Sequence, residues 1–540
     1  MRRVRSVGGL LLAMSAGAAW VGQSARVSVT PVLEELIDSL RATGSLVIEG
    51  RTVHANPILL AAYERHDFEP IWSRRADLTA LLRAVNAASS DGLDPDVYHR
   101  SALTGLSVLP LGPDLAAGLD LLATDAFVRL SHDLRFGRTR SADSTGLVEG
   151  MGPFGSSDPA ADVLDVVASG LLEQHMSALR PKHFEYDRLV RGLAELRTIE
   201  HEGGWASIPA GPTMRRDTVD ARVPMLRRRL VRTGDLGHEG QGPEEPASRR
   251  FDRALEHAVK HFQRRHGLND DGRVGDHTLE ALNVPVERRI EQVRVNLERA
   301  RRAERDLPAD FVSVDVAGAR VHVSRSGTVA FDTRAVVGEE ETPTPTFSAL
   351  MSYIELNPTW TVPRGMVEDV LTAVRADPRY MADREIGVLD SAGLSVDAAM
   401  LDFSTFTPET FPYFFHQAPG PTNPLGRIKL MFPNDYAVYL HDSPARWAFA
   451  EEERLFSHGC VRVEDPIGLA VEVLDDPDTW SRETLEDAIS EGENLAIPLT
   501  RPLPVYLFYR TVKADRAGTL HFYEDVYDRD TAILAALGSR

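Results

Sequence analysis

The amino-acid sequence predicts a multidomain α+β protein, with a helical scaffold, a small helical domain and a mainly-β C-terminal domain. Apolar residues recur at helical spacing over most of residues 31–200. From residue 311 onward, alternating apolar positions and β-branched residues between glycine turns indicate strands. The length of 540 residues allows about three domains, and a linker with Gly and Pro at 203–223 separates the first two.

Residues 1–25 have the pattern of a signal peptide or an N-terminal anchor. Arg2, Arg3 and Arg5 precede an uncharged apolar run from Val7 to Val21. This arrangement is typical of export signals, and the run is short for a membrane span. A cleaved signal and an uncleaved anchor both remain open. In either case we expect the protein to lie outside the cytoplasmic membrane.

The charge bears on the class of partner. The net charge is −20, and no basic stripe stands out from this acidic background. Nucleic-acid binding depends on basic surfaces that neutralise phosphates. The composition therefore predicts no nucleic-acid partner.

Two helical units are expected before residue 290. Residues 30–205 form a scaffold domain whose helices end at glycine or proline, with a loop at 137–165. Residues 222–287 form a compact unit in which Leu255, Val259 and Phe262 share one helix face. A polar loop at 237–250 interrupts this unit, and a charged helix at 288–305 links it to the next domain.

A mainly-β domain is expected at 309–500. Strands alternate with glycine turns from residue 311, and a later strand ends at His441. Residues 501–540 are expected to form a hairpin, turned at 516–518, and a helix that pack on the preceding domains.

Cys460 is the only cysteine, and it lies in the stretch LFSHGCVRV. A single thiol cannot form an internal disulfide, and an exported thiol needs a reason to be kept. Three interpretations are open: a buried structural thiol, a zinc ligand together with His441 and His458, or a nucleophile. Zinc commonly takes four ligands, and no CxxC or HxxxH pair supplies the rest. We therefore expect no metal site.

The neighbours of Cys460 supply what thiol chemistry requires. His441 lies 19 residues earlier at the end of a strand, and His458 lies two residues before the cysteine. A histidine base forms the thiolate. Gly459 lets backbone amides approach a ligand, and Arg462 together with a nearby helix start lowers a thiol pKa.

The segment HDSPARWAFAEEERLFSHGCVRV, which starts at His441, resembles the L,D-transpeptidase (YkuD-type) signature. In that signature a histidine is followed, after a spacer, by S/T-H-G-C-x-R/N, and here 15 residues separate His441 from Ser457. Flanking segments are similar to the large periplasmic branch known from Gram-negative bacteria: NPTWTVP at 357–363, APGPTNPLGRIKLMFPN at 418–434 and VYLHDSP at 438–444. GLDPDVYH at 92–99 and DLRFGR at 133–138 resemble its scaffold.

Residues 222–285 resemble the peptidoglycan-binding domain 1 family. The matching positions are Ala258, Phe262, Gln263, Gly267, Leu268, Asp271, Gly272, Gly275, Thr278, Leu279 and Asn283. Together, the resemblances imply a YkuD-type catalytic domain at 309–500, with a capping insertion at 364–412 over the active site.

The resemblance implies a role for each catalytic residue. Cys460 is the nucleophile, and His441 is the base, with its ring held by a backbone carbonyl near Asp442. The backbone amides of His458, Gly459 and Cys460 form an oxyanion hole. His458 also holds the loop by hydrogen bonds, with general-base action as the alternative.

Substrate contacts are expected from Arg462, Tyr439, Ser457, Trp360 and Asn357. Arg462 orders the loop or meets a substrate carboxylate, and Tyr439 lies on the same strand face as His441. Core packing is the alternative for Trp360. The family branch commonly has FRVRQ where this chain has YFFHQ at 413–417, with Phe414 and His416 in place of the two arginines, and there we expect donor or acceptor contacts to differ.

The implied activity is acyl transfer to peptidoglycan. The thiolate attacks the third residue of a tetrapeptide stem, usually meso-diaminopimelate, and expels D-Ala. A neighbouring stem amine then takes the acyl group and forms a 3→3 cross-link, without any cofactor. Water, a D-amino acid or a lipoprotein lysine are alternative acceptors, and a non-catalytic wall-binding scaffold is a different class of function.

The resemblance also implies partners and a location. The expected partners are peptidoglycan stem peptides and glycan, other cell-wall synthases, and carbapenem β-lactams as covalent inhibitors. The expected location is the periplasm, reached through a signal peptide or with a tether to the inner membrane formed by residues 7–21.

Overall fold

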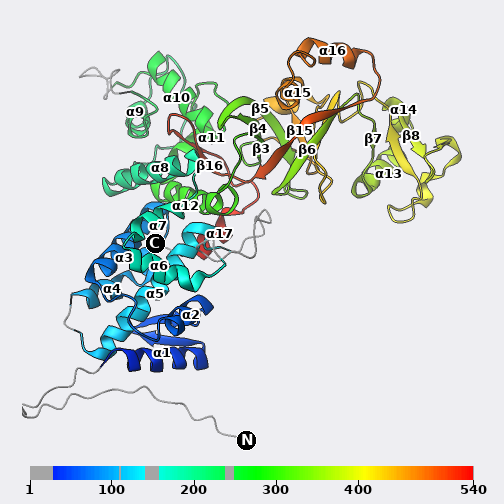
Figure 1. Cartoon of the computed structure of the whole chain (residues 1–540). Coiled ribbons are helices and arrows are strands. Elements are labelled where there is room, and N and C mark those ends of the chain that lie inside the picture. The colour runs from blue at the N-terminus through cyan, green and yellow to red at the C-terminus, as the bar shows by residue number, and fades with distance from the viewer. Residues whose placement is uncertain (1–27, 109–110, 140–156, 238–247, 539–540) are drawn as a thin grey trace, which may run out of the picture.

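The computed structural model describes residues 28–108, 111–139, 157–237 and 248–538. The predicted signal or anchor at 1–25 lies outside these residues, as do most of the expected loops at 137–165 and 237–250. Within the described ranges, no helix combines the length and the apolar character that crossing a membrane requires. The predicted multidomain α+β class is confirmed (Figure 1).

The N-terminal unit is a bundle of helices around one almost completely buried helix. Its helices are α1 (Thr30–Thr43), α2 (Pro57–Arg65), α3 (Arg75–Ala87), α4 (Arg100–Ser107), α5 (Pro113–Phe136), α6 (Pro159–Ser169) and α7 (Leu172–Ala178). α5 lies at the centre, and its buried Asp120 accepts hydrogen bonds from the Tyr63 hydroxyl at 2.6 Å and the Trp72 amide at 2.8 Å. A hairpin of β1 (Ser45–Ile48) and β2 (Arg51–His54) interrupts the helices, which helical periodicity did not predict.

The small helical unit packs α9 (Val223–Arg232), α10 (Arg253–Arg265) and α11 (Asp276–Asn283) around one core. Leu255, Val259 and Phe262 are buried in that core. The Gln263 side chain donates to Asp271, Thr278 and the Arg273 carbonyl, and accepts from the Gly272 amide at 2.9 Å. One buried amide therefore holds the glycine turn against the helix, because each of its polar atoms is satisfied there.

The C-terminal domain contains a nine-stranded sheet. Its strands are β3 (Phe311–Asp315), β4 (Arg320–Arg325), β5 (Thr328–Gly338), β6 (Phe347–Leu356), β11 (Ile428–Met431), β12 (Leu440–His441), β13 (Leu455–Ser457), β14 (Val461–Val463) and β15 (Leu495–Phe508). The order is β13-β5-β14-β12-β11-β6-β15-β3-β4, and β4 also pairs with β5, so the sheet closes on itself. Closure satisfies the backbone groups that an edge strand would expose. Helices α15 (Pro466–Leu474) and α16 (Arg482–Ser490) follow β14.

The long strand β15 crosses the domain boundary expected at residue 500. It pairs with β6 along most of its length and with β3 over Val505 to Phe508. Residues 501–508 therefore belong to the sheet, because their backbone groups complete its ladders. The expected C-terminal hairpin begins later, with β16 (Val512–Ala514) and β17 (Leu520–Phe522).

The expected insertion at 364–412 is the middle of a slightly larger unit. A separate sheet with the order β7-β10-β8-β9 joins β7 (Trp360–Thr361), β8 (Ile386–Leu389), β9 (Ser395–Val396) and β10 (Phe414–Gln417). Helices α13 (Val367–Ala376) and α14 (Tyr380–Asp383) pack on it around Leu371 and Phe415. This unit lies beside the nine-stranded sheet at the right of Figure 1.

The chain's last segment packs against the helical units. α8 (Phe184–His201) and α12 (Val286–Ala303) share a core with the β16–β17 hairpin. The final helix, α17 (Asp530–Leu537), inserts Ile533 and Leu537 into the core of the N-terminal bundle. Residues more than 300 positions apart in sequence thus share one apolar interior.

Helix α12 carries a fully buried ion pair. Glu298 and Arg301 are both 0% exposed, with Arg301 Nη2 2.8 Å from Glu298 Oε2. Glu298 also accepts from the Arg138 and Thr139 amides, and Arg301 donates to the Asp91 carbonyl at 2.7 Å. The pair therefore joins α12 to the end of α5 and to the loop after α3.

Replacing Arg301 with methionine should lower the free energy of unfolding by about 3–5 kcal/mol, because it leaves the Glu298 carboxylate buried without its partner. The control is Arg288→Met on the same helix, where the arginine is 66% exposed, and there the change should stay within about 0.5 kcal/mol. Urea unfolding followed by circular dichroism measures both. Equal midpoints for the two variants would contradict the prediction.

Candidate active site

Strand pairing brings Cys460 beside the start of β12. β12 and β14 are parallel neighbours, with Leu440 opposite Val461 and His441 opposite Arg462. Cys460 directly precedes β14 and Tyr439 directly precedes β12, and the Val461 amide donates to the Tyr439 carbonyl at 3.1 Å. Because adjacent strands keep this register, the thiol lies beside the Tyr439 side chain.

The Cys460 thiol is half-buried in a polar environment. Its Sγ atom lies 3.8 Å from the Ala437 carbonyl oxygen. Burial raises the pKa of Cys460 above its usual range, although hydrogen bonds from Tyr439 and the charges of Lys429 and Arg462 oppose that shift. Burial and the neighbouring thiol also raise the pKa of Tyr439. At neutral pH the resting thiol and phenol are therefore both protonated.

His441 is buried and held in one orientation. Its Nδ1 lies 2.6 Å from the carbonyl oxygen of Asp442. A carbonyl only accepts hydrogen bonds, so Nδ1 carries the proton and Nε2 keeps its lone pair. Burial, together with the charges of Arg462 and Lys429, lowers the pKa of His441 to about 3. The ring is thus neutral at physiological pH and able to accept a proton.

The carboxylate of Asp442 is engaged elsewhere. It accepts from the Arg427 amide at 3.0 Å and lies 3.5 Å from Arg446. The backbone carbonyl of Asp442, and not its side chain, therefore orients His441. This is the arrangement that the resemblance implied for the histidine's partner.

Ser457 and Thr344 shape the loop that carries the thiol. The Ser457 hydroxyl donates to the Cys460 carbonyl and accepts from the Gly459 amide at 3.2 Å. Thr344 donates to the Gly459 carbonyl at 2.9 Å and accepts from the Gly338 amide. Gly459 has φ of +104°, a conformation that side-chain-bearing residues rarely adopt.

The Gly459 amide is occupied by Ser457, which changes the expected oxyanion hole. Of the three amides assigned to it, those of His458 and Cys460 have no acceptor among the described residues. Two free donors next to the nucleophile are enough to bind a tetrahedral oxyanion. Ser457 thus lies in the site as a loop-holding residue.

His458 faces the insertion. Its Nε2 lies 3.7 Å from Glu339 and 3.6 Å from Asp369, and Asp369 belongs to α13. Within the described chain, His441 and Cys460, the other two candidate zinc ligands, are not paired with Glu339 or Asp369. Elsewhere, His183, Glu185 and Glu304 lie close enough to hold a metal, but Arg510 already pairs with both glutamates, at 3.7 and 2.7 Å. The positive charge of the Arg510 guanidinium therefore occupies the place that a metal ion would take.

Arg462 lies in the site without a fixed partner. Within the described chain it has no ion pair within 4.0 Å, and burial lowers its pKa while Cys460 and Glu339 raise it. Lys429, which stands opposite His441 in β11, lies 4.3 Å from the Tyr439 ring centroid. These two cations give the site a positive potential.

Trp360 and Asn357 make their contacts with the insertion and with the segment around α16. Trp360 packs against the core of the insertion, and Asn357 donates to the Ile489 and Glu493 carbonyls at 3.0 Å each. Phe414 and His416 also lie in the insertion, on β10, with His416 3.1 Å from the Thr361 hydroxyl. These contacts hold α16 and the insertion in place.

Three residues of the site were not predicted from the sequence. Lys429 and Thr344 lie on segments that meet the thiol loop only through sheet pairing and loop packing. Tyr527, from the C-terminal segment, donates to the Gly338 carbonyl beneath the loop. Of these three residues, only Thr344 had a local signal in the sequence, because it lies in the Thr-Pro repeat TPTPTF that leads into β6.

The single cysteine makes the thiol pKa directly measurable. Alkylation of Cys460 by iodoacetamide should rise with pH only above the range of an ordinary thiol, because the raised pKa leaves less thiolate at any given pH. Tyr439→Phe should move the profile to still higher pH, because it removes a hydrogen bond to the thiolate.

Intact-mass spectra from pH 6 to 11 give the rates, and the same chain unfolded in urea supplies the reference thiol. A folded-state profile at or below that of the unfolded chain would contradict the expectation.

Models of three domain families match the chain. They are described as "Scaffold domain" at residues 58–193, "Putative peptidoglycan binding domain" at 220–282 and "L,D-transpeptidase catalytic domain" at 309–479. The last match contains His441 and Cys460.

Similar proteins carry the same description. A "Putative L,D-transpeptidase" of Haemophilus influenzae is 30% identical over 223 residues, which are 41% of this chain and 45% of that relative, so less than half of the relative's length is matched. A solved L,D-transpeptidase of Xylanimonas cellulosilytica is 17% identical, covering 56% of this chain and 99% of its own, and the Ldtfm–avibactam carbamoyl enzyme is 12% identical, covering 37% and 49%. Both have a TM-score of 0.19, so neither adds to the assignment. The chain therefore carries an L,D-transpeptidase catalytic domain, joined to a scaffold domain and a peptidoglycan-binding domain.

Proposed function

We propose that the protein is a cysteine-dependent L,D-transpeptidase that makes 3→3 cross-links in peptidoglycan. The observation that carries the proposal is the register of β12 and β14 within the matched catalytic domain. This register supports the proposal because it sets Cys460 just before the strand that pairs with the strand of His441, and His441 is neutral with its Nδ1–H donating to the Asp442 carbonyl. A thiol, an oriented imidazole and two free amides are the parts that acyl transfer needs.

In the first step the donor stem acylates the thiol. The Cys460 side chain turns from the Ala437 carbonyl toward His441, and Nε2 takes its proton as sulfur attacks the carbonyl carbon of the third stem residue. The amides of His458 and Cys460 stabilise the oxyanion. When the tetrahedral intermediate collapses, the C–N bond to D-Ala breaks, and His441 returns the proton to the leaving amine.

The acid–base properties of the resting site favour a coupled proton transfer. The pKa of His441 is about 3, and that of Cys460 is raised, so a resting thiolate–imidazolium pair is disfavoured. The proton therefore moves as the carbon–sulfur bond forms. Arg462 and Lys429 stabilise the negative charge that develops on sulfur.

In the second step an acceptor amine releases the acyl group. His441 takes a proton from the side-chain amine of a neighbouring stem as it attacks the thioester, and the thiol regains a proton when the C–S bond breaks. Arg462, which has no ion-pair partner among the described residues, is the candidate contact for a stem carboxylate. Tyr439 lines the same side of the site. Glycan contacts fall to the peptidoglycan-binding domain.

The location and partners of the protein follow from this function. A cross-linking enzyme must meet its substrate outside the cytoplasmic membrane, which agrees with the export pattern at residues 1–25 and favours the periplasm. Other cell-wall synthases supply the stems that it joins. Carbapenems acylate the same thiol, because their strained amide presents a carbonyl to the nucleophile.

The test incubates the full chain with disaccharide-tetrapeptide and reads the products by mass spectrometry. The wild type should release D-Ala and form dimers with a 3→3 fragment pattern. Cys460→Ala should form none, and His441→Gln should lose about 10²–10⁴-fold in rate, because it removes the base. His54→Gln, at an exposed histidine on β2 of the N-terminal unit, is the matched control and should keep full activity.

Each alternative gives a different product. D-Ala release without dimers would assign water or another acceptor to the same thiol. Retention on sacculi with neither D-Ala release nor a carbapenem adduct in the intact mass would overturn the enzyme proposal in favour of a wall-binding scaffold.

A further inference from the structure

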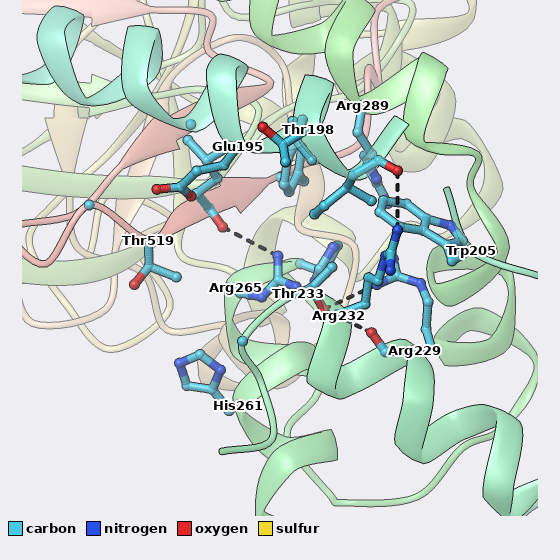
Figure 2. A pocket seen from close by; sticks show the side chains of 18 of the residues that line it. Glu195, Thr198, Trp205, Arg229, Arg232, Thr233, His261, Arg265, Arg289 and Thr519 are labelled. Atoms are coloured by element: carbon cyan, nitrogen blue, oxygen red, sulfur yellow. Dashed lines mark hydrogen bonds between the residues drawn. The ribbon is translucent and has the colours of Figure 1, made fainter. Parts of the chain in front are cut away.

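A cavity of about 520 Å³ lies where the small helical unit meets α8, α12 and the C-terminal hairpin. Figure 2 shows the arginines Arg229, Arg232, Arg265 and Arg289 with Trp205 around it. The lining comes from parts of the chain more than 300 residues apart, and includes no residue of β12 or β14. It is separate from the thiol site, and no step of the proposed reaction uses it.

The cavity is locally cationic in a strongly acidic protein. Arg265 is paired with Asp235, Nε to Oδ1 at 2.6 Å, and Arg232 lies 3.1 Å from Glu202. Arg229 and Arg289 have no carboxylate within 4.0 Å in the described part of the chain. The one acidic residue in the lining is the exposed Glu195 at the rim.

Among the described residues, Arg229 and Arg289 donate only to neutral groups. Arg229 donates from Nε to the Leu282 carbonyl at 2.9 Å and from Nη1 to Thr233 at 3.1 Å. Arg289 donates from Nη1 to Gln292 at 2.8 Å and from Nη2 to the Ala281 carbonyl at 3.2 Å.

Both of these guanidinium groups are buried, with residue exposures of 3% and 7%. The buried Nε atoms of Arg289 and Arg232 have no hydrogen-bond acceptor within the described ranges of the chain. Burial and repulsion from Arg265 lower the pKa of Arg229 and of Arg289 to about 9. Both stay cationic at neutral pH. Buried charge without a counterion is unfavourable unless a partner arrives.

Trp205 gives the cavity an apolar wall. Its ring lies 3.7 Å from the Arg229 guanidinium carbon, and its indole Nε1 donates to the Val284 carbonyl at 3.0 Å. The hydrogen bond fixes the ring, and the ring holds the guanidinium plane. Leu196 and Phe522 add apolar surface to the lining. A bare ion would leave this surface uncovered, whereas the volume suits a small organic molecule.

We propose that this cavity binds an organic carboxylate, with the carboxylate at Arg229 and Arg289 and the apolar body against Trp205. A planar guanidinium matches a carboxylate through paired hydrogen bonds, which makes arginine the residue suited to this ligand class. Because α9, α10, α12 and the hairpin all line the cavity, the ligand stabilises the docked arrangement of these units.

The test titrates the full chain with N-acetyl-D-alanyl-D-alanine, its C-terminal amide and inorganic phosphate. The carboxylate peptide should raise Tm and change the tryptophan fluorescence, and the amide should do neither. Trp205→Phe should remove the fluorescence change, which assigns the signal to this cavity among the six tryptophans.

Charge variants test the arginines. Arg229→Gln should weaken peptide binding about tenfold or more, because it removes a charge-assisted hydrogen bond. Arg228→Gln, at the exposed neighbouring position on the same helix, should bind as the wild type does. Glu195→Gln on the rim should tighten binding severalfold, and it keeps the proposal testable if Arg229→Gln fails to fold.

The result that overturns the proposal is specific. Binding of phosphate without the peptide would make the cavity an inorganic-anion site. Equal binding of peptide and amide, unchanged affinity in both the Arg229 and Glu195 variants, or no binding by any probe would each reject an organic-carboxylate site. Because no readout involves Cys460, failure here leaves the transpeptidase proposal untouched.

Discussion

Helix α12 carries the buried charges on which the arrangement of the helical units depends. Glu298 and Arg301 pair in its C-terminal half, Arg294 donates to the Gly92 carbonyl at 2.9 Å, and Arg299 pairs with Asp530 in α17. Each charged side chain loses its hydration when the units dock, and burial is tolerated only where a partner group forms an ion pair or hydrogen bond with it. The scaffold and the C-terminal segment therefore dock on α12 together, because removing either one leaves charged groups of α12 without partners.

The active-site geometry follows from a second constraint, the parallel pairing of two very short strands. The register of β12 and β14 sets His441 opposite Arg462, and it brings Cys460 beside Tyr439, because these two residues directly precede the paired strands. Neighbouring elements hold this alignment: β11 on one side of β12, β5 on the other side of β14, and Thr344 under the Gly459 carbonyl. A buried, neutral imidazole is thus available as a base without a carboxylate to charge it.

The thiol site and the arginine cavity beside Trp205 differ in how their charged groups are paired. Near the thiol, Lys429 and Arg462 offset the burial of a developing thiolate, so cations and reactive group are matched within one domain. In the cavity beside Trp205, no carboxylate of the described residues pairs with Arg229 or Arg289, although Asp235 pairs with Arg265 and Glu202 with Arg232. The cavity therefore keeps buried positive charge that a ligand could neutralise, whereas Arg265 and Arg232 in the same lining are already paired with carboxylates of the protein.

The sequence alone determined the features that depend on local residue patterns. Periodicity separated the helical and β regions, because burial of one face has a period of 3.6 in helices and two in strands. The order S-H-G-C with an upstream histidine identified the thiol loop, since the loop needs glycine at positive φ and a hydroxyl at Ser457 to hold it. Tertiary structure alone decided that β15 crosses residue 500, that the Gly459 amide is already bonded, and that Trp360 and Asn357 support other contacts. It also brought Lys429, Thr344 and Tyr527 to the thiol loop and assembled the arginine cavity. These features depend on pairing between distant segments. The local sequence around a residue does not specify which distant strand or helix will pack beside it.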